Sequence, residues 1–274
     1  SYGLLGALSL FHPFIISVWG SDVYDFPAVS RIHKNLLIFN LSRADKILST
    51  SHVMANHTKK FTQKEIDVTP FGIDLEKFKP LPKLEGNKIT IGTVKTLRPK
   101  YGIDLLLKAF QIVNKECSDC NLQLEIIGEG EEKLSLKELA VSLGINDKVN
   151  FVGRISNNEV PQYLNNMDIY VALSVLDSES FGVAIVEASA CELPVVVSNV
   201  AGLAEVVDNE VTGLVVKKKD VNAAANAIKK LVYNAEMRQT LGRNGRKKVF
   251  NQYNWSINVE QMIKIYKRIL NENY

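Results

Sequence analysis

The sequence predicts an α/β protein of two halves, each a parallel sheet with helices on both faces, the first half being incomplete. Apolar segments alternate with segments of helical periodicity along almost the whole chain. Strands that are apolar throughout are typical of parallel sheets buried between helices. The first half has three such segments, whereas a doubly wound half usually has about six.

In the first half, the strand-like segments are short and closely spaced. The expected strands are 14–18, 46–49 and 66–69, and the expected helices are 29–41 and 53–61. Three parallel strands alone would leave an unpaired sheet edge. The chain also begins with serine rather than methionine, so we expect an upstream segment to be missing.

The second half alternates more regularly. Its expected strands are 88–94, 122–127, 149–152, 168–173, 194–198 and 213–216. Its expected helices are 103–116, 131–143, 158–166, 182–191, 221–233, 235–253 and 256–273. This order favours a parallel sheet covered on both faces.

Composition excludes several classes of protein. The net charge of +3 arises from scattered basic residues, which is not the pattern of a nucleic-acid-binding protein. Three cysteines, an odd and low count, indicate a reducing compartment without a disulfide framework. The apolar segment 4–19 is interrupted by Gly6, His12 and Pro13 and is too short to span a bilayer. The sequence does not exclude peripheral contact with a membrane.

The candidate site lies between Glu179 and Glu187. The loop 174–181 leaves the carboxyl end of an expected strand, which is where open α/β sheets bind ligands. Gly182 then begins a helix whose free N–H groups and dipole suit a diphosphate. Glu187 stands among apolar residues, where an unbound carboxylate is costly, and its side chain leans back toward the helix start.

A ribose diol beside the diphosphate would therefore suit Glu187, and Glu179 is placed to accept hydrogen bonds from a sugar hydroxyl. The alternative interpretation is a surface carboxylate in the loop together with a helical carboxylate paired with a lysine.

Further motifs accompany the two glutamates in a fixed order. They comprise Phe181 and Gly182 between the glutamates, then 193–198, 201–205 and 209–216, with 127–130, 149–154, 43–51 and 69–74 upstream. Together they resemble the family-four retaining glycosyltransferases of the GT-B fold, also called glycosyl transferases group 1. The resemblance covers nearly the whole chain, with the start of the N-terminal domain missing.

The resemblance implies two Rossmann-like domains with parallel sheets. Residues 1–77 would be a partial, acceptor-side domain, 78–87 a linker, 88–253 the nucleotide-sugar-binding domain, and 254–274 a helix crossing back to the first domain.

It also implies a role for each site residue. Glu179 would contact the donor sugar and Glu187 the ribose. The remaining donor-binding positions would be Phe181, Gly182 and Val183 at the phosphate or sugar, Arg154 and Ile155 beside the base, and Gly128. No metal or other cofactor is expected.

Two lysines are the candidates for the phosphate-binding basic pair. Lys95 and Lys100 keep the family's usual separation, but Tyr101 intervenes before the glycine that normally follows. Arg98 is the alternative candidate for either position of this basic pair. Such cations would stabilise the charge on a departing diphosphate. Each of the three could instead be an ordinary loop cation.

The end of the first strand departs from the family pattern. Trp19 stands where many members have a histidine that contacts the transferred sugar. Asp22 could bind an acceptor or sugar hydroxyl, or could cap the next segment. With Asp22, the candidate catalytic residues are Glu179 and Lys100.

The function implied is transfer of a sugar, with retention, from a UDP- or GDP-sugar to a glycan or lipid-linked acceptor in cell-surface polysaccharide synthesis. The expected location is cytoplasmic, with contact at the inner membrane face left open. Two alternatives remain: a fragment that binds the nucleotide sugar without transferring it, and a relative such as a nucleotide-sugar epimerase.

Overall fold

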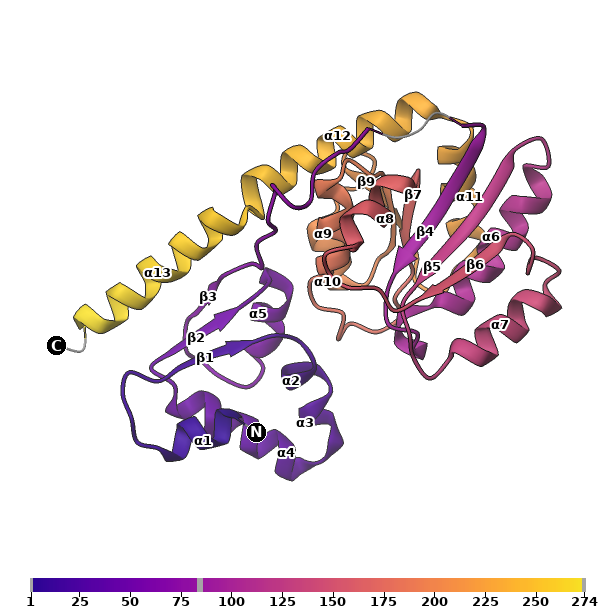
Figure 1. Ribbon diagram of the computed structural model, residues 1–274. Helices are drawn as coiled ribbons and strands as arrows, with labels where there is room; N and C mark the ends of the chain where they lie inside the picture. Colours follow the sequence, from indigo (N-terminus) through magenta and orange to yellow (C-terminus); the bar gives the residue numbers. More distant parts are fainter. Residues whose placement is uncertain (1, 83–85, 273–274) are drawn as a thin grey trace.

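The computed structural model describes residues 2–82 and 86–272. Residue 1, residues 83–85 of the expected linker and residues 273–274 of the expected final segment lie outside this description. Two parallel sheets organise the chain, one of three strands in the order β1-β2-β3 and one of six in the order β6-β5-β4-β7-β8-β9. Figure 1 shows them in two separate bodies, joined by an extended segment and by the long C-terminal helices. The predicted α/β class with parallel sheets is confirmed.

The N-terminal body is small. Its strands are β1 (Ile15–Val18), β2 (Lys46–Ser49) and β3 (Ile66–Val68). Its helices are α1 (Tyr2–Leu8), α2 (Ser21–Tyr24), α3 (Phe26–Val29), α4 (Arg31–Arg43) and α5 (His52–Thr58). Among its described residues, the core is a buried cluster that includes Val18, Leu41, Ile47 and Met54.

The expected single helix over 29–41 is wrong at its start. Ser30 is extended, with φ −164° and ψ 169°, and separates α3 from α4. Its hydroxyl accepts a hydrogen bond from the backbone N–H of His33 at 3.4 Å. Serine is favoured at such a position because its side chain satisfies an N–H group that the helix leaves free.

The six-stranded sheet forms the larger body. Its strands are β4 (Lys88–Val94), β5 (Asn121–Ile127), β6 (Val149–Gly153), β7 (Ile169–Ala172), β8 (Val195–Ser198) and β9 (Gly213–Val216). Its helices are η1 (Pro99–Tyr101), α6 (Ile103–Glu116), α7 (Lys133–Ser142), α8 (Val160–Asn166), α9 (Val183–Ala190), α10 (Ala201–Val206) and α11 (Val221–Val232). The segments expected from the sequence are present to within two residues at each end, whereas η1 and α10 were not anticipated.

Side chains of successive strand residues enter two different cores. In β7, Ile169 and Val171 join the cluster that contains α6, α7 and α11, whereas Tyr170 and Ala172 join the cluster that contains α8 and α9. This alternation explains why the strands are apolar throughout.

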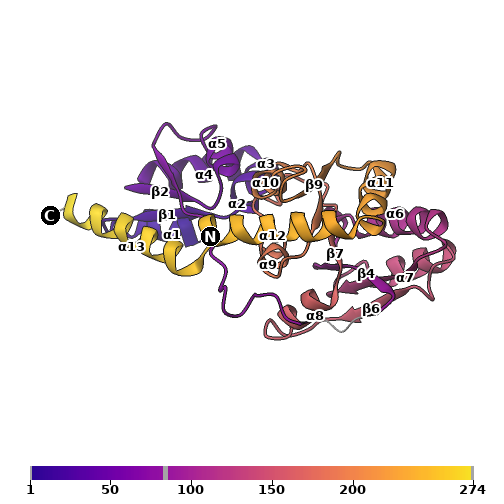
Figure 2. The same cartoon turned by 90° about the horizontal axis from the view of Figure 1, so that it is seen from above.

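Two consecutive helices connect the bodies at the C-terminal end. In Figures 1 and 2, α12 (Ala235–Gln252) lies along the larger body and α13 (Trp255–Glu272) extends past the smaller one. From α13, Asn258 Nδ2 donates to the carbonyl of Pro70 at 3.1 Å, and Arg268 pairs with Asp67 at 2.8 Å. The division of the chain into domains stays a prediction.

Direct contacts also join the bodies near the carboxyl ends of the strands. Glu205, on α10, accepts hydrogen bonds from the backbone N–H groups of His52 and Val53 at 2.8 Å each. Ser180 Oγ donates to the carbonyl of Trp19 at 3.0 Å. Among the described segments, no helix is both long and apolar enough to cross a bilayer.

Candidate functional site

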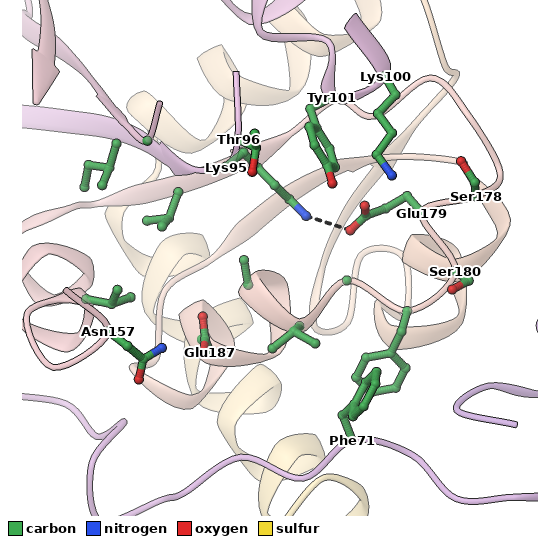
Figure 3. Close-up of a pocket in the computed structure, with 18 of the residues that line it drawn as sticks. Phe71, Lys95, Thr96, Lys100, Tyr101, Asn157, Ser178, Glu179, Ser180 and Glu187 are labelled. Carbon is green, nitrogen blue, oxygen red and sulfur yellow. Dashed lines mark hydrogen bonds and ion pairs between the residues drawn. The ribbon is translucent and has the colours of Figure 1, made fainter. Parts of the chain in front are cut away.

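A cavity of about 660 Å³ opens at the carboxyl ends of β4, β5 and β7. The β7–α9 loop and the start of α9 form one wall, and Trp19, Ser21 and Phe71 line the cavity from the first 77 residues. Figure 3 shows charged side chains from the residue after β4, from η1 and from this loop converging on its interior. The position is that of ligand sites in open α/β sheets.

The start of α9 depends on one glycine. Gly182 has φ +84° and ψ 53°, the left-handed conformation, and immediately precedes the helix. A Cβ at this position would lie 2.7 Å from Leu203 Cδ2, so a larger residue is strained and crowded. Gly182, Val183 and Ala184 line the cavity at this end of α9, where backbone N–H groups lack an acceptor within the helix.

Glu187 lines the same cavity from α9. Burial raises the pKa of its carboxyl from 4.5 to about 7, and the charges of Lys95 and Lys77 oppose this shift. Within the described part of the chain its carboxylate has no hydrogen bond or ion pair. A carboxyl that is partly buried and unpaired next to a cavity is suited to a ligand that supplies the missing partner.

Glu179 and Lys95 are already paired. Lys95 Nζ lies 2.6 Å from Glu179 Oε1, and the two side chains are only 12% and 11% exposed. The predicted loop carboxylate is therefore not a surface group, since Glu179 is buried against β4. Figure 3 draws this pair across the cavity.

Lys100 reaches the cavity from η1, beside Tyr101. Its Nζ lies 4.9 Å from the centroid of the Tyr101 ring, and Lys95 Nζ lies 4.8 Å from the same centroid. The structure thus brings together both predicted lysines, both glutamates and the start of α9.

The other end of the cavity is lined by Gly128, Arg154 and Ile155, whose expected contacts with a donor stay predictions. The backbone N–H of Gly128 donates to the carbonyl of Gly153 at 2.9 Å, which joins the ends of β5 and β6. Phe181 and Val183 also line the cavity, on either side of Gly182.

Two predicted site residues lie elsewhere. Arg98 is exposed and is not part of the cavity wall. The carboxylate of Asp22 accepts hydrogen bonds from the backbone N–H groups of Trp19 and Gly20, at 3.1 and 2.6 Å, and lines a neighbouring hollow. Of the two interpretations of Asp22, the capping one matches these contacts, because its oxygens hold the turn after β1.

Several lining residues were not singled out by sequence reasoning. They are Phe71, Thr96, Asn157, Ser178 and Ser180, all labelled in Figure 3. Phe71 belongs to a chain of edge-to-face aromatic contacts, 5.5 Å from Trp19 and 5.5 Å from Phe181 between ring centroids. The sequence signal that could have identified Phe71 as a lining residue is its position in the motif 69–74.

The assembled groups suit a polyanionic ligand with hydroxyl groups. Two lysines and a helix start supply positive potential, while two carboxylates can accept hydrogen bonds. Over residues 2–82 and 86–272, no three His, Cys, Asp or Glu side chains form a group that could hold a metal ion.

Sequence comparison adds two family matches. The family model "Glycosyl transferases group 1" matches residues 74–248, and "Glycosyl transferase 4-like" matches residues 1–51. The chain is 31% identical over 252 residues to the capsular polysaccharide biosynthesis glycosyltransferase CapM of Staphylococcus aureus, covering 91% of this chain and 63% of the relative. It is 28% identical to a GDP-mannose-dependent α-(1-6)-phosphatidylinositol monomannoside mannosyltransferase of Mycobacterium tuberculosis, over 69% of this chain and 52% of the relative.

The chain therefore spans less than two thirds of the length of these two relatives. Among solved structures, Anabaena HepE in complex with UDP-glucose has a TM-score of 0.85 at 19% identity, over 97% of this chain and 76% of that one. This likeness confirms the GT-B fold. On the match over residues 74–248, the chain belongs to the glycosyl transferases group 1 family.

Proposed function

We propose that the chain binds a UDP- or GDP-sugar and takes part in retaining transfer of the sugar to a glycan or lipid-linked acceptor. The observation that carries this proposal is the partly buried, unpaired carboxyl of Glu187, which lines the cavity from the middle of α9. Related proteins support the ligand class, since the HepE structure holds UDP-glucose and the mycobacterial relative is GDP-mannose-dependent. The name of CapM supports a role in cell-surface polysaccharide synthesis.

In the proposed complex, the diphosphate lies at the start of α9, near Lys95 and Lys100. Glu187 accepts hydrogen bonds from the ribose hydroxyls, and Glu179 from a hydroxyl of the sugar. The base lies beside Arg154 and Ile155. This order follows the cavity from the Lys100 end to the ends of β5 and β6.

The proposed reaction breaks the bond between the anomeric carbon and the phosphate oxygen. An acceptor hydroxyl attacks from the same face, and the departing phosphate oxygen takes its proton. Negative charge grows on the diphosphate as the bond breaks, so the lysines and the α9 amides act most strongly in the transition state. No metal is required in this scheme.

We also propose a cytoplasmic location with peripheral contact at the inner membrane face. The three cysteines are free, which fits a reducing compartment. Fractionation of cells that express the full-length protein tests both parts of this proposal.

Thermal-shift measurements with UDP-, GDP- and ADP-sugars test the donor class, because ligands of the native state raise its apparent stability. Calorimetry with the preferred donor then compares Glu187→Ala with Glu138→Ala, an exposed carboxylate on α7. We expect the first variant to weaken binding about 10- to 100-fold, since hydrogen bonds to charged groups contribute about 1.5–3 kcal/mol. Unchanged affinity in a folded Glu187→Ala protein would contradict the proposal.

Donor binding without transfer is a second candidate, favoured by the cavity lining, most of which comes from the larger body that would hold the donor. Product formation in the presence of an acceptor separates it from the transferase. Products that form from the donor without any acceptor would instead indicate an epimerase-like activity.

A further inference from the structure

We infer that Tyr101 is a positioning residue that holds the ammonium groups of Lys95 and Lys100 at the phosphate end of the cavity. This inference rests on the proposed function, because it concerns the same lysines. Tyr101 is also where the sequence departs from the pattern of its family, standing between the second lysine and the glycine. The ring lines the cavity with both lysines.

The backbone fixes where the ring stands. Gly102 follows it with φ +63°, and a Cβ there would lie 2.2 Å from the carbonyl oxygen of Leu173. The carbonyl of Lys100 accepts a hydrogen bond from the backbone N–H of Val175 at 2.9 Å. The turn is therefore packed against the loop that follows β7, and Tyr101 cannot shift without disturbing it.

Both ammonium groups lie at cation–π distance from this one ring. The separations from the centroid are 4.8 Å for Lys95 and 4.9 Å for Lys100. Figure 3 shows the ring between the two side chains, both of which point toward Glu179. A cation near an aromatic face is attracted by about 0.5–1 kcal/mol when exposed and by about 2 kcal/mol or more when desolvated.

The two lysines differ in what else restrains them. Lys95 is paired with Glu179 at 2.6 Å, which neutralises its charge. Lys100 has no side-chain hydrogen bond or ion pair with the residues that the structure describes, and its ammonium group is restrained by the cation–π contact with Tyr101. A ring is uncharged, so it restrains Lys100 while leaving the positive charge available to an anion.

An aromatic ring can therefore restrain both lysines without neutralising them, which a carboxylate could not do. Two cations that are to bind one diphosphate repel each other in the empty site. The ring offsets part of that repulsion and limits the side-chain freedom that binding would otherwise have to remove. The aromatic face does this, and the phenol oxygen is not needed.

The test compares Tyr101→Phe, which keeps the ring, with Tyr101→Leu, which keeps apolar bulk without it. Tyr163→Leu on α8 is the matched control, because Tyr163 is also half-buried and packs on a core but does not line the cavity. Calorimetry measures the affinity of each protein for UDP and for uridine, with GDP and guanosine as the parallel pair. Circular dichroism checks that each variant is folded.

We expect Tyr101→Leu to weaken binding of the diphosphate about tenfold while changing binding of the nucleoside less than about twofold. Tyr101→Phe and Tyr163→Leu should stay within about twofold of the wild type for both ligands. Equal weakening for nucleoside and diphosphate would overturn the inference and leave the proposed function standing, since the ring would then contact the nucleoside. Unchanged diphosphate affinity in Tyr101→Leu would also overturn it. A wild-type protein that binds neither UDP nor GDP would overturn both proposals.

Discussion

The carboxyl of Glu187 should make the stability of the ligand-free protein depend on pH. Burial raises its pKa from 4.5 to about 7, so the native state holds a proton that the unfolded chain releases earlier. The native state therefore binds more protons between these two values, and stability falls as pH rises from 4.5 toward 7. At about 1.4 kcal/mol per pKa unit, the total is about 3 kcal/mol.

The perturbation is Glu187→Gln, which keeps the shape and polarity of the protonated side chain but never ionises. Relative to the wild type, this variant should be nearly equal in stability at pH 4.5 and more stable by about 3 kcal/mol at pH 8. Urea denaturation followed by circular dichroism measures both differences. The same change at Glu138, an exposed position on α7, serves as the control.

One result would refute the reasoning directly. If Glu187→Gln differs from the wild type by the same free energy of unfolding at pH 4.5 and at pH 8, the carboxyl titrates alike in both states. The raised pKa of Glu187 would then no longer support its role as a ligand-binding group.

Two further predictions concern residues that shape the site. Gly182→Ala should destabilise the protein by about 1–3 kcal/mol in urea denaturation, because the position has φ +84° and its Cβ would crowd Leu203. A loss below about 0.5 kcal/mol would show that the start of α9 relaxes freely. Glu205→Gln should lower the free energy of unfolding by about 1–3 kcal/mol, because the Glu205 carboxylate accepts two backbone hydrogen bonds from the other body. Retained stability with a single unfolding transition would mean that this contact does not hold the bodies together.

The fold was largely predictable because its strands are short, apolar and separated by helices. β4 and β9 begin and end as expected, since hydrophobic periodicity depends on residues close in sequence. The errors occur where a single polar side chain decides a boundary. Ser30 interrupts the expected helix over 29–41 by capping α4, and periodicity does not register such a hydrogen bond.

The site was predictable in part, for a different reason. Glu187 is conspicuous in the sequence because an acidic residue in an apolar helix is costly, and its raised pKa reflects that cost. The pairing of Lys95 with Glu179 joins residues 84 apart in the chain. Their spacing gave no sign of it, since the pair depends on β4 and β7 being neighbours in the sheet.

The loop between β7 and α9 links donor binding to the contact between the two bodies. Glu179 faces Lys95 inside the cavity, and the next residue, Ser180, donates to the carbonyl of Trp19 in the N-terminal body. A ligand that draws Lys95 away from Glu179 would therefore act one residue away from the contact with Trp19. Trp19 lines the same cavity, so the N-terminal body contributes to the cavity wall. The same loop therefore contributes both to the donor cavity and to the contact between the two bodies.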